Sequence, residues 1–334
     1  MSGAGESAGA VAYPDAAAIR AAHELVRRHW PPTRLVEAPS LAGRTGCPVW
    51  LKLETDLPTG SFKPRGAVWA LSVSLARRRV EEVVASSTGN HGAAVAYAAR
   101  LLGCRATIFL PERPNPVKRA RIAGLGAALV ERGRDITEAF RHASEHAART
   151  GAYFLNDATD PDLPAGPATI GVEIFERLSD VEAVFVPMGD TALIRGIGAA
   201  ARAWSPRTRI VGVQAERAPA YYLSWREGRA IATPDCDTIA DGLATRTPDP
   251  GNVRAIRELV AEVRLVTEAE MLAAVRHLLF EEHVVAEPAG AAPAAALLAG
   301  GARPGGAVVA LVSGANIAPD VLRRAVCAEE GPPR

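Results

Sequence analysis

The sequence is poor in aromatic residues and in cysteines. Aromatic residues make up 5% of the 334 residues, whereas 48% are hydrophobic. The core must therefore consist mainly of aliphatic side chains between closely packed helices. The Cys-x-x-Cys spacing of zinc sites and redox pairs is absent. This usage fits a reducing compartment, and we expect a cytoplasmic protein. The four cysteines are Cys47, Cys104, Cys236 and Cys327.

Charge of one sign and long apolar runs are also missing. The net charge is +1 and there is no long basic block, which argues against nucleic acid as a partner. The apolar stretch Ala286–Val312 is broken by Pro288, Pro293 and Pro304, so we expect no membrane span. Residues 1–14 lack the basic start and apolar centre of a signal peptide, and we expect them to form a disordered tail.

Short apolar runs alternate with helical patterns along most of the chain. A first helix is expected over 15–30, and the stretch 215–250 is expected to be irregular and rich in turns. The alternation predicts a mostly parallel α/β protein, in which ligands bind beyond the carboxyl ends of the strands. The expected strands cover 49–53, 83–87, 106–110, 128–130, 184–187, 209–213 and 307–312.

Four polar loops follow expected strands, and we expect them to form one cleft. Two of them, 87–92 and 189–192, run into an expected helix. A helix N-terminus offers unpaired N–H groups and a positive dipole end, so these two loops could hold two anions, such as a phosphate and a carboxylate. The other two loops cover 58–66 and 313–316.

Lys63 lies in the first of these loops. Pro64 follows it and disfavours helical backbone angles at Lys63, so the next helix is expected to begin near Ala67. A lysine that is shielded from water loses its proton more easily and becomes a nucleophile able to form a Schiff base. An isolated loop lysine is more often simply solvated. The chemical interpretation therefore depends on the other loops.

Several motifs resemble those of the fold-type II pyridoxal-phosphate enzymes, in particular the serine/threonine dehydratase and serine racemase branch. Thr59–Ala67, with the sequence TGSFKPRGA, resembles the lysine motif of that family, which is highly specific. Ser87–Gly92, with the sequence STGNHG, resembles its asparagine loop. The stretches 239–243 and 287–291 match further signatures, and the whole resemblance covers about 32–319.

The resemblance implies a fold and a domain organisation. The fold is α/β, with two open, mostly parallel twisted sheets and flanking helices, similar to the tryptophan synthase β subunit. A large cofactor-binding domain would comprise 15–80 and 156–334. A small mobile domain, 81–155, would carry the asparagine loop, and the protein would be a homodimer.

The resemblance also implies the cofactor, pyridoxal 5'-phosphate. Lys63 would hold it as a Schiff base and later act as the base at the substrate α-carbon. Phe62 would lie near the cofactor ring, Asn90 would bind the ring hydroxyl, and Ser313 would bind the pyridine nitrogen. A neutral serine leaves the ring a weaker electron sink, which favours β-elimination. The phosphate would bind at Gly189, Asp190, Thr191, Ala192 and Leu193, and the substrate carboxylate at Ser87, Thr88, Asn90 and His91.

Plain structural interpretations stay open for some of these residues. Phe62 could be an ordinary core side chain, Asn90 could be a turn residue, and His91 could only shape its loop. Glu287 lies nearby by analogy, and its role stays open.

The phosphate loop departs from the run of glycines that is usual in the family. Here it reads Gly189-Asp190-Thr191-Ala192, whose backbone N–H groups and Thr191 hydroxyl could still bind a phosphate. A carboxylate about 4 Å from a phosphate charge costs about 4 kcal/mol at an effective dielectric of about 20. We therefore expect Asp190 to turn away and cap the helix that begins near Leu193. The loop resembles that of the dehydratase of hydroxyectoine utilisation.

The metal-binding segment of racemase-like relatives also differs. Gln214 and Ala220 stand where those relatives carry acidic ligands, so we expect no bound metal there, although Glu216 could be a displaced ligand. A third departure is Gly166-Pro167, where the family has Gly-Gln before the helix between the domains.

These features predict an ammonia-lyase, a dehydratase that performs α,β-elimination on a β-hydroxy amino acid such as L-threonine or L-serine. The products would be a 2-oxo acid and ammonia. Thr88 is the second candidate catalytic residue, at the position where racemases carry a serine that protonates the substrate. Its branched side chain is stiff, and we expect its hydroxyl to be locked onto the backbone, so that elimination dominates.

Other functions on this fold stay open. The alternatives are a racemase, a β-replacement or threonine synthase-type enzyme, and a pseudoenzyme that only binds the cofactor. No regulatory domain is expected after the catalytic part, and therefore no feedback control by isoleucine.

Overall fold

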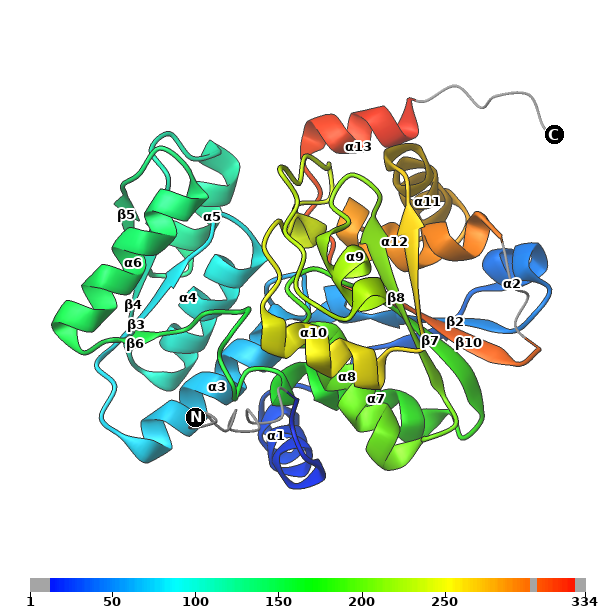
Figure 1. Cartoon of the computed structure of the whole chain (residues 1–334), viewed down its shortest axis with the longest axis horizontal. Helices are drawn as coiled ribbons and strands as arrows, with labels where there is room; N and C mark the ends of the chain where they lie inside the picture. Colours follow the sequence, from blue (N-terminus) through cyan, green and yellow to red (C-terminus); the bar gives the residue numbers. More distant parts are fainter. Residues whose placement is uncertain (1–12, 301–304, 328–334) are drawn as a thin grey trace, which may run out of the picture.

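The computed structural model describes residues 13–300 and 305–327 and contains two open β-sheets (Figure 1). The larger sheet has the strand order β1-β2-β10-β7-β8-β9, and the smaller has the order β5-β4-β3-β6. β1 runs antiparallel to β2, and all other neighbouring strands are parallel, which confirms the expected fold. The strands are β1 (Leu35–Glu37), β2 (Val49–Leu53), β3 (Glu82–Ser86), β4 (Arg105–Leu110), β5 (Ala128–Glu131), β6 (Tyr153–Phe154), β7 (Val181–Pro187), β8 (Arg209–Ala215), β9 (Glu262–Val266) and β10 (Ala307–Val312).

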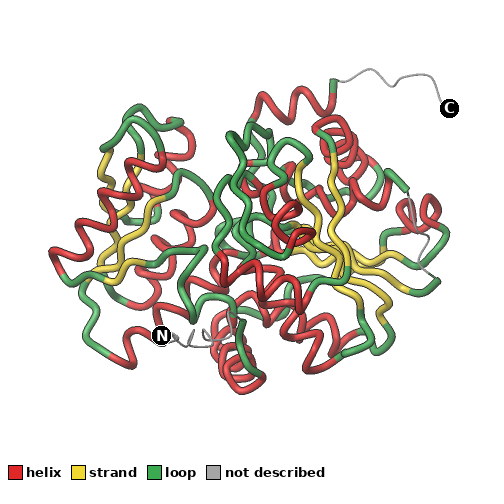
Figure 2. The backbone as a smooth tube through the Cα atoms, in the orientation of Figure 1, coloured by secondary structure: helices red, strands yellow, loops and turns green. Residues whose placement is uncertain are grey.

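Helices flank both sheets, and Figure 2 shows the strands of each sheet as a separate group between them. The α-helices are α1 (Ala16–His29), α2 (Pro39–Thr45), α3 (Lys63–Arg77), α4 (Asn90–Leu102), α5 (Pro116–Gly124), α6 (Ile136–Thr150), α7 (Ala165–Arg177), α8 (Ala192–Trp204), α9 (Ala220–Glu227), α10 (Pro250–Leu259), α11 (Glu268–Phe280), α12 (Pro288–Leu298) and α13 (Pro319–Val326). Two 3-10 turns, η1 (Glu54–Asp56) and η2 (Asp241–Leu243), complete the described elements.

The core is built from small aliphatic side chains, as the composition predicts. α12 consists largely of alanine, is buried on all sides, and lies against α11 and four strands of the larger sheet. Alanine lets helix and sheet backbones approach closely, and a helix that is apolar all round must be buried. The apolar residues of α7, α8 and α10 form a separate cluster with the same sheet. The larger sheet is therefore covered on both faces.

α3 connects the two sheets, because it packs against α4 of the smaller unit and against α7 of the larger one. It begins at Lys63, with Phe62 as its N-cap, four residues before the expected start near Ala67. The expectation was wrong because Pro64 falls within the first two helical positions, where proline has no hydrogen bond to lose and its fixed φ suits the helix. Lys63 is therefore held on the first turn of a helix.

The first helix matches its expected range. Asp15 caps α1 by accepting a hydrogen bond from the Ala18 backbone N–H at 2.8 Å, and two prolines follow its end. The tail expected over 1–14 lies outside the described residues, apart from its last two. Of these, Tyr13 donates a hydrogen bond to Glu258 at 2.8 Å.

Six short elements do not follow from the sequence patterns: β1, α2, β6, α9, β9 and α13. Each is too short to show a clear periodicity. β9 is an edge strand that pairs only with β8, so it depends on the sheet already being in place. α9 lies in the stretch 215–250 that was expected to be irregular. In both cases tertiary contacts decide what local propensity leaves open.

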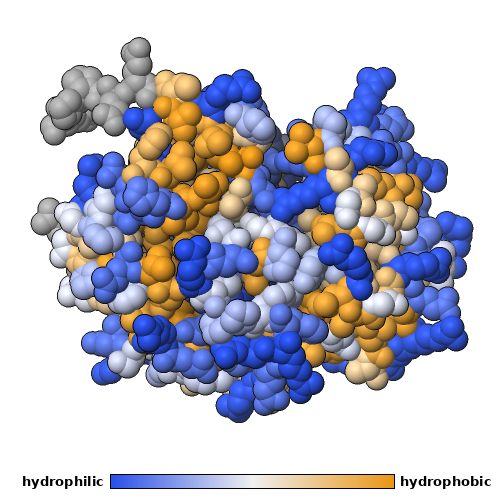
Figure 3. Space-filling model, turned by 180° about the vertical axis from the view of Figure 1, so that it is seen from behind, coloured by the Kyte–Doolittle hydropathy of each residue, from blue (hydrophilic) through white to orange (hydrophobic). Residues whose placement is uncertain are grey.

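None of the described helices is long and apolar enough to span a membrane. From behind, hydrophobic residues form a broad patch on the side of the larger sheet (Figure 3).

Candidate active site

The lysine loop and the loop after β10 are joined by backbone hydrogen bonds. The Phe62 N–H donates to the Ser313 carbonyl at 2.9 Å, and the Ala315 N–H donates to the Gly60 carbonyl at 2.9 Å. Gly314, between them, has no room for a side chain, because a Cβ atom there would lie 2.7 Å from Oε1 of Glu287. The start of α3 is therefore held directly beside the end of β10.

The asparagine loop reaches the same place. Asn90 is the first residue of α4, and its Nδ2 donates to Oε1 of Glu287 at 2.8 Å. Its Oδ1 accepts from Nδ2 of Asn316 at 2.6 Å, while the Asn316 N–H donates to Oε2 of Glu287 at 3.0 Å. Burial raises the pKa of Glu287, and the hydrogen bonds from Asn90 and Asn316 oppose that shift. Glu287 thus links the asparagine loop to the loop after β10, which is itself hydrogen bonded to the lysine loop.

The amine of Lys63 meets a carboxylate that the sequence patterns did not indicate. Nζ of Lys63 lies 2.6 Å from Oδ2 of Asp157, and the two side chains are 22% and 23% exposed. Nδ1 of His91 lies 3.9 Å from the same oxygen, and Nε2 of His91 lies 2.9 Å from the Leu155 carbonyl oxygen. Asp157 lies just after β6 in a polar turn, but β6 was not among the expected strands, so the signal that marked the four other loops did not mark this one.

These contacts set the charges of the group. Burial lowers the pKa of Lys63, but the surrounding carboxylates, Asp157 first and then Asp190 and Glu287, together outweigh that effect and the net pKa is raised. Burial would raise the pKa of Asp157, yet the charges of His91 and Lys63 hold it well below its usual range. Burial lowers the pKa of His91. Lys63 is therefore an ammonium paired with a carboxylate, and not the readily deprotonated amine that burial alone would produce.

Phe62 lies beside this amine. Nζ of Lys63 is 5.5 Å from the centroid of the Phe62 ring, and Phe62 packs against the apolar cluster that includes α7 and α8. The ring is partly buried, so both its core interpretation and a cofactor contact fit.

The fourth loop, between β7 and α8, has an unusual backbone. Thr191 is the N-cap of α8 with a positive φ of 67°, and it gives the helix no side-chain hydrogen bond. A Cβ atom at Gly189 would lie 2.2 Å from the Gly242 carbonyl oxygen, so only glycine fits there. The backbone of this loop and the open first turn of α8 fit an anion such as a phosphate.

Asp190 does not cap α8, which corrects the expectation. Its Oδ1 accepts a hydrogen bond from Oγ1 of Thr245 at 3.0 Å, so the side chain is held by the segment before α10. Burial raises the pKa of Asp190 to about 6, and the nearby Asp157 adds to the shift. A carboxyl group that is protonated more easily opposes a bound phosphate less than a fully ionised one would.

Arg195 supports the same loop from within α8. Its Nε donates to Oγ1 of Thr191 at 3.1 Å, and Nη2 donates to the Ala158 carbonyl at 3.1 Å. Burial lowers the pKa of Arg195 to about 10, so it stays charged at neutral pH. Because Thr191 accepts from Arg195, its own hydroxyl proton can point toward a phosphate. The loop therefore fits a phosphorylated cofactor.

Ser87 and Thr88 lie in the loop before α4, as expected. Oγ of Ser87 accepts from the Gly89 N–H at 3.1 Å. Within the part of the chain that the structure describes, the Thr88 hydroxyl has no hydrogen-bond partner, so the expected lock onto the backbone is absent. The expectation rested on the stiffness of the Thr88 side chain at χ1, and that stiffness alone does not place the hydroxyl against a hydrogen-bond acceptor.

The segment compared with metal-binding relatives is packed. Oε1 of Gln214 accepts from the Tyr222 N–H at 2.8 Å, and Ala220 begins α9. No group of three or more His, Cys, Asp or Glu side chains suited to a metal occurs within 13–300 and 305–327.

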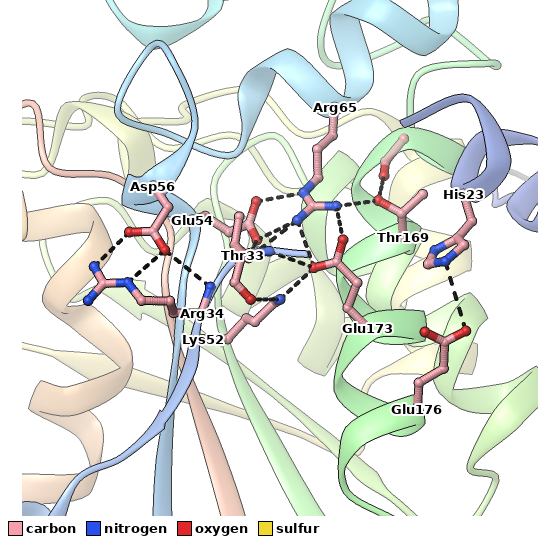
Figure 4. Close-up of polar contacts among 11 residues, drawn as sticks. His23, Thr33, Arg34, Lys52, Glu54, Asp56, Arg65, Thr169, Glu173 and Glu176 are labelled. Carbon is pink, nitrogen blue, oxygen red and sulfur yellow. Dashed lines mark hydrogen bonds and ion pairs between the residues drawn. The ribbon is translucent and has the colours of Figure 1, made fainter. Parts of the chain in front are cut away.

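A second polar network surrounds Arg65 near the start of α3 (Figure 4). Nε of Arg65 lies 2.7 Å from Oε2 of Glu54, and its Nη1 lies 2.7 Å from Oε1 of Glu173. Nζ of Lys52 lies 2.5 Å from Oε2 of Glu173. All four side chains are at most 1% exposed. This network ties the first turn of α3 to β2, η1 and α7.

Known proteins are similar to this chain in sequence and in fold. The family described as "Pyridoxal-phosphate dependent enzyme" matches residues 26–314. The L-threonine ammonia-lyase of Geobacter sulfurreducens is 36% identical over 94% of this chain and 78% of that protein. The L-threonine ammonia-lyase of Thermotoga maritima is 37% identical over 88% of this chain and 73% of that protein.

Solved structures agree with these relatives. A threonine deaminase from T.th. superposes with a TM-score of 0.85 at 33% identity, covering 91% of this chain and 98% of that one. Maize serine racemase superposes with a TM-score of 0.88 at 26% identity, covering 93% of this chain and 96% of that one.

Proposed function

The chain belongs to the family of pyridoxal-phosphate dependent enzymes, and from this premise we propose that it is an ammonia-lyase acting on a β-hydroxy amino acid. L-Threonine and L-serine are the first substrates to consider, since relatives that match most of the chain are named L-threonine ammonia-lyases. The observation that carries the proposal is the Lys63 amine at the point where the lysine, asparagine and β10 loops meet. One water leaves the substrate to give an enamine, and hydrolysis of its imine form takes up one water and releases a 2-oxo acid and ammonia.

The chain's own residues divide the work. When bound, the cofactor withdraws electrons from the substrate α-carbon, so that its proton becomes acidic. Lys63 would hold the cofactor aldehyde covalently and would afterwards accept the α-proton. The N–H groups at the start of α4, around Ser87 to His91, bind the substrate carboxylate. Ser313, which is neutral, would contact the pyridine nitrogen and leave the electron withdrawal modest, which favours rapid loss of the β-hydroxyl.

Cofactor orientation comes from the remaining residues. Asn90 would donate to the ring hydroxyl and Phe62 would lie along the ring. The phosphate would bind at Gly189, Asp190, Thr191, Ala192 and Leu193, where the backbone is open and Arg195 supports Thr191.

Racemisation is a second candidate. It is supported by the Thr88 hydroxyl, which has no partner among the described residues and could act as an acid, and by the likeness to maize serine racemase. Purified enzyme supplied with L-threonine and L-serine separates the two. We expect 2-oxo acid and ammonia in excess of the D-amino acid. If D-serine exceeds pyruvate, the lyase proposal is wrong. No turnover with either substrate or with other β-hydroxy amino acids would also contradict it.

Activity without a divalent cation is part of the proposal. It is supported by Gln214, whose side chain is hydrogen bonded to the Tyr222 backbone where relatives carry an acid. Chelator should leave turnover and melting temperature unchanged. A melting shift with Mg²⁺ that chelator reverses would contradict this.

The assembly and the domain motion are further proposals. Phe280, the last residue of α11, and Val285, which lies shortly after it, are 51% and 47% exposed, and this supports a homodimer. The four free cysteines support a cytoplasmic location. A small domain over 81–155 that moves against the rest is supported by the polar character of several links across its boundary. These are the Asn90–Glu287, Lys118–Asp241 and Arg121–Thr59 contacts.

A further inference from the structure

We propose that Asp157 is a positioning residue for Lys63, which holds the amine in place and makes it a stronger base. Its Oδ2 lies 2.6 Å from Nζ of Lys63, and the same oxygen lies 3.9 Å from Nδ1 of His91. The reaction in which Lys63 acts as a base rests on the proposed function. The contact itself, and its effect on the lysine, do not.

The segment that carries Asp157 is held on both sides. Before it, Oδ1 of Asn156 accepts from the Ala158 N–H at 3.0 Å, which closes a tight turn around Asp157. After it, the Ala158 carbonyl accepts from Nη2 of Arg195 at 3.1 Å and from Nδ2 of Asn252 at 2.9 Å. α8 and α10 thus fix the backbone next to Asp157. The carboxylate meets the lysine because its segment is built to place it there.

Other carboxylates face Lys63, but each is engaged elsewhere. Asp190 accepts from Oγ1 of Thr245 at 3.0 Å, and Glu287 accepts from Nδ2 of Asn90 at 2.8 Å. Both raise the pKa of Lys63 less than Asp157 does. Among the described residues, only Asp157 contacts the amine directly, so its removal should change the charge of Lys63 most.

The Asp157 carboxylate should affect two steps, cofactor capture and elimination, in opposite directions. Capture of the cofactor aldehyde needs the neutral amine, so a carboxylate that favours the ammonium slows capture. During elimination the proton moves from the substrate α-carbon to Nζ of Lys63, and Asp157 stays ionised throughout. There the carboxylate stabilises the ammonium that forms, and so speeds the step. Loss of Asp157 should therefore speed capture and slow turnover. A residue that only supports the fold would slow both.

The test compares Asp157→Asn, Asp157→Glu and a control, Asp162→Asn. Asp162 belongs to the same segment, but its carboxylate faces outward to Arg77 at 2.6 Å. The full chain, freed of cofactor, is mixed with pyridoxal phosphate across the pH range in which lysine amines titrate. Capture is followed by absorbance, and borohydride reduction with peptide mapping confirms that Lys63 is the site.

For Asp157→Asn we expect the midpoint of the pH dependence of the capture rate to move down by about 1 to 3 pH units, which is the usual effect of removing an adjacent opposite charge. At neutral pH capture should be about tenfold faster or more, because each unit is a factor of about ten in neutral amine. kcat should fall with KM little changed. Asp157→Glu should restore part of both effects, and Asp162→Asn should match the wild type.

An unchanged capture midpoint in Asp157→Asn overturns the inference. The inference is also overturned if the capture rate, the turnover and the melting temperature of Asp157→Asn all fall together, because a purely structural residue would give that pattern. Capture needs no substrate. A wild type that captures the cofactor on Lys63 but releases no ammonia from β-hydroxy amino acids would therefore defeat the proposed function and leave this inference standing.

Discussion

Lys63 and Arg65 are two residues apart on the first turn of α3, yet their side chains lie in polar surroundings that differ in exposure and in charge balance. Arg65 enters a sealed network with Glu54 and Glu173, in which no side chain is more than 1% exposed. Lys63 enters the site, where it and Asp157 are 22% and 23% exposed. In the sealed network two cations face two carboxylates. Around Lys63, carboxylates outnumber the lysine.

The difference explains why one network can be reactive and the other cannot. In the sealed network each charge has an opposite partner within hydrogen-bond distance, so changing any protonation state leaves an unpaired buried charge. In the site the imbalance pushes pKa values apart: that of Asp190 rises to about 6 and that of Asp157 falls. Groups whose pKa values are pushed apart in this way are typical of catalytic sites.

The largest effect is expected for Lys63→Ala. Turnover should be abolished or nearly so, because the covalent attachment of the cofactor and the base are both lost, while the melting temperature stays close to that of the wild type. The chain has three lysines, Lys52, Lys63 and Lys118. Borohydride reduction of the native enzyme should label the Lys63 peptide. A label on Lys52 or Lys118 would mean that the site is elsewhere.

Arg65→Met should show the opposite pattern. It leaves Glu54 and Glu173 partly unpaired in a buried site, which costs about 3 to 5 kcal/mol of unfolding free energy. Arg77→Met is the matched control on the same helix, because Arg77 pairs with Asp162 at the surface and such pairs contribute about 0 to 1 kcal/mol. Denaturant unfolding measures both. Equal losses in the two variants would contradict the distinction between the networks.

Asp190→Asn should stabilise the cofactor-free protein at neutral pH. The folded-state pKa of about 6 lies above the ordinary value of 3.8, so the contribution of Asp190 to stability is present below about 3.8 and is lost as pH rises through about 6. Asparagine cannot ionise, so the variant avoids this loss of folding stability, which is at most about 3 kcal/mol for a pKa shift of about two units. Its side-chain oxygen can still accept the hydrogen bond from Thr245. Melting curves at several pH values, with and without cofactor, test it. An unchanged pH dependence would contradict the role of Asp190.

Thr191→Val should weaken cofactor retention by about 1 kcal/mol, because the shape stays and the hydroxyl is lost. Thr191→Ser, which keeps the hydroxyl, serves as the control. Cofactor release during dialysis or dilution measures both. Equal retention in the two variants would show that the backbone alone holds the phosphate.

The smallest effect is expected for Thr88→Val, which removes a hydroxyl that has no partner among the described residues. Elimination should be nearly unchanged, whereas any D-serine formed from L-serine should decrease. Turnover in heavy water, with pyruvate and D-serine measured together, gives the partition. A large loss of pyruvate formation would mean that Thr88 acts in elimination as well.

Much of this arrangement could be predicted from the sequence, because the relevant signals are local. The strand ends and the glycine-rich turns placed Lys63, Asn90 and Ser313 in loops that do converge. Predictions failed where two local preferences compete. Pro64 disfavours helix at the residue before it, yet suits a helix start, and packing of α3 against α4 and α7 decided in favour of the helix. The same holds for Asp190, where Thr245, distant in sequence, outcompeted the helix end.

The sequence by itself determined the family and its cofactor and singled out Lys63 as the candidate attachment residue, because the motif Thr59–Ala67 is contiguous and needs no folding to be read. Only the tertiary structure decided which acid meets that lysine. Asp157 is 94 positions away, and it comes to Lys63 because α8 and α10 clamp the Ala158 carbonyl beside it. An ion pair acts over a few ångströms, and which distant groups come that close is set by packing and not by local sequence.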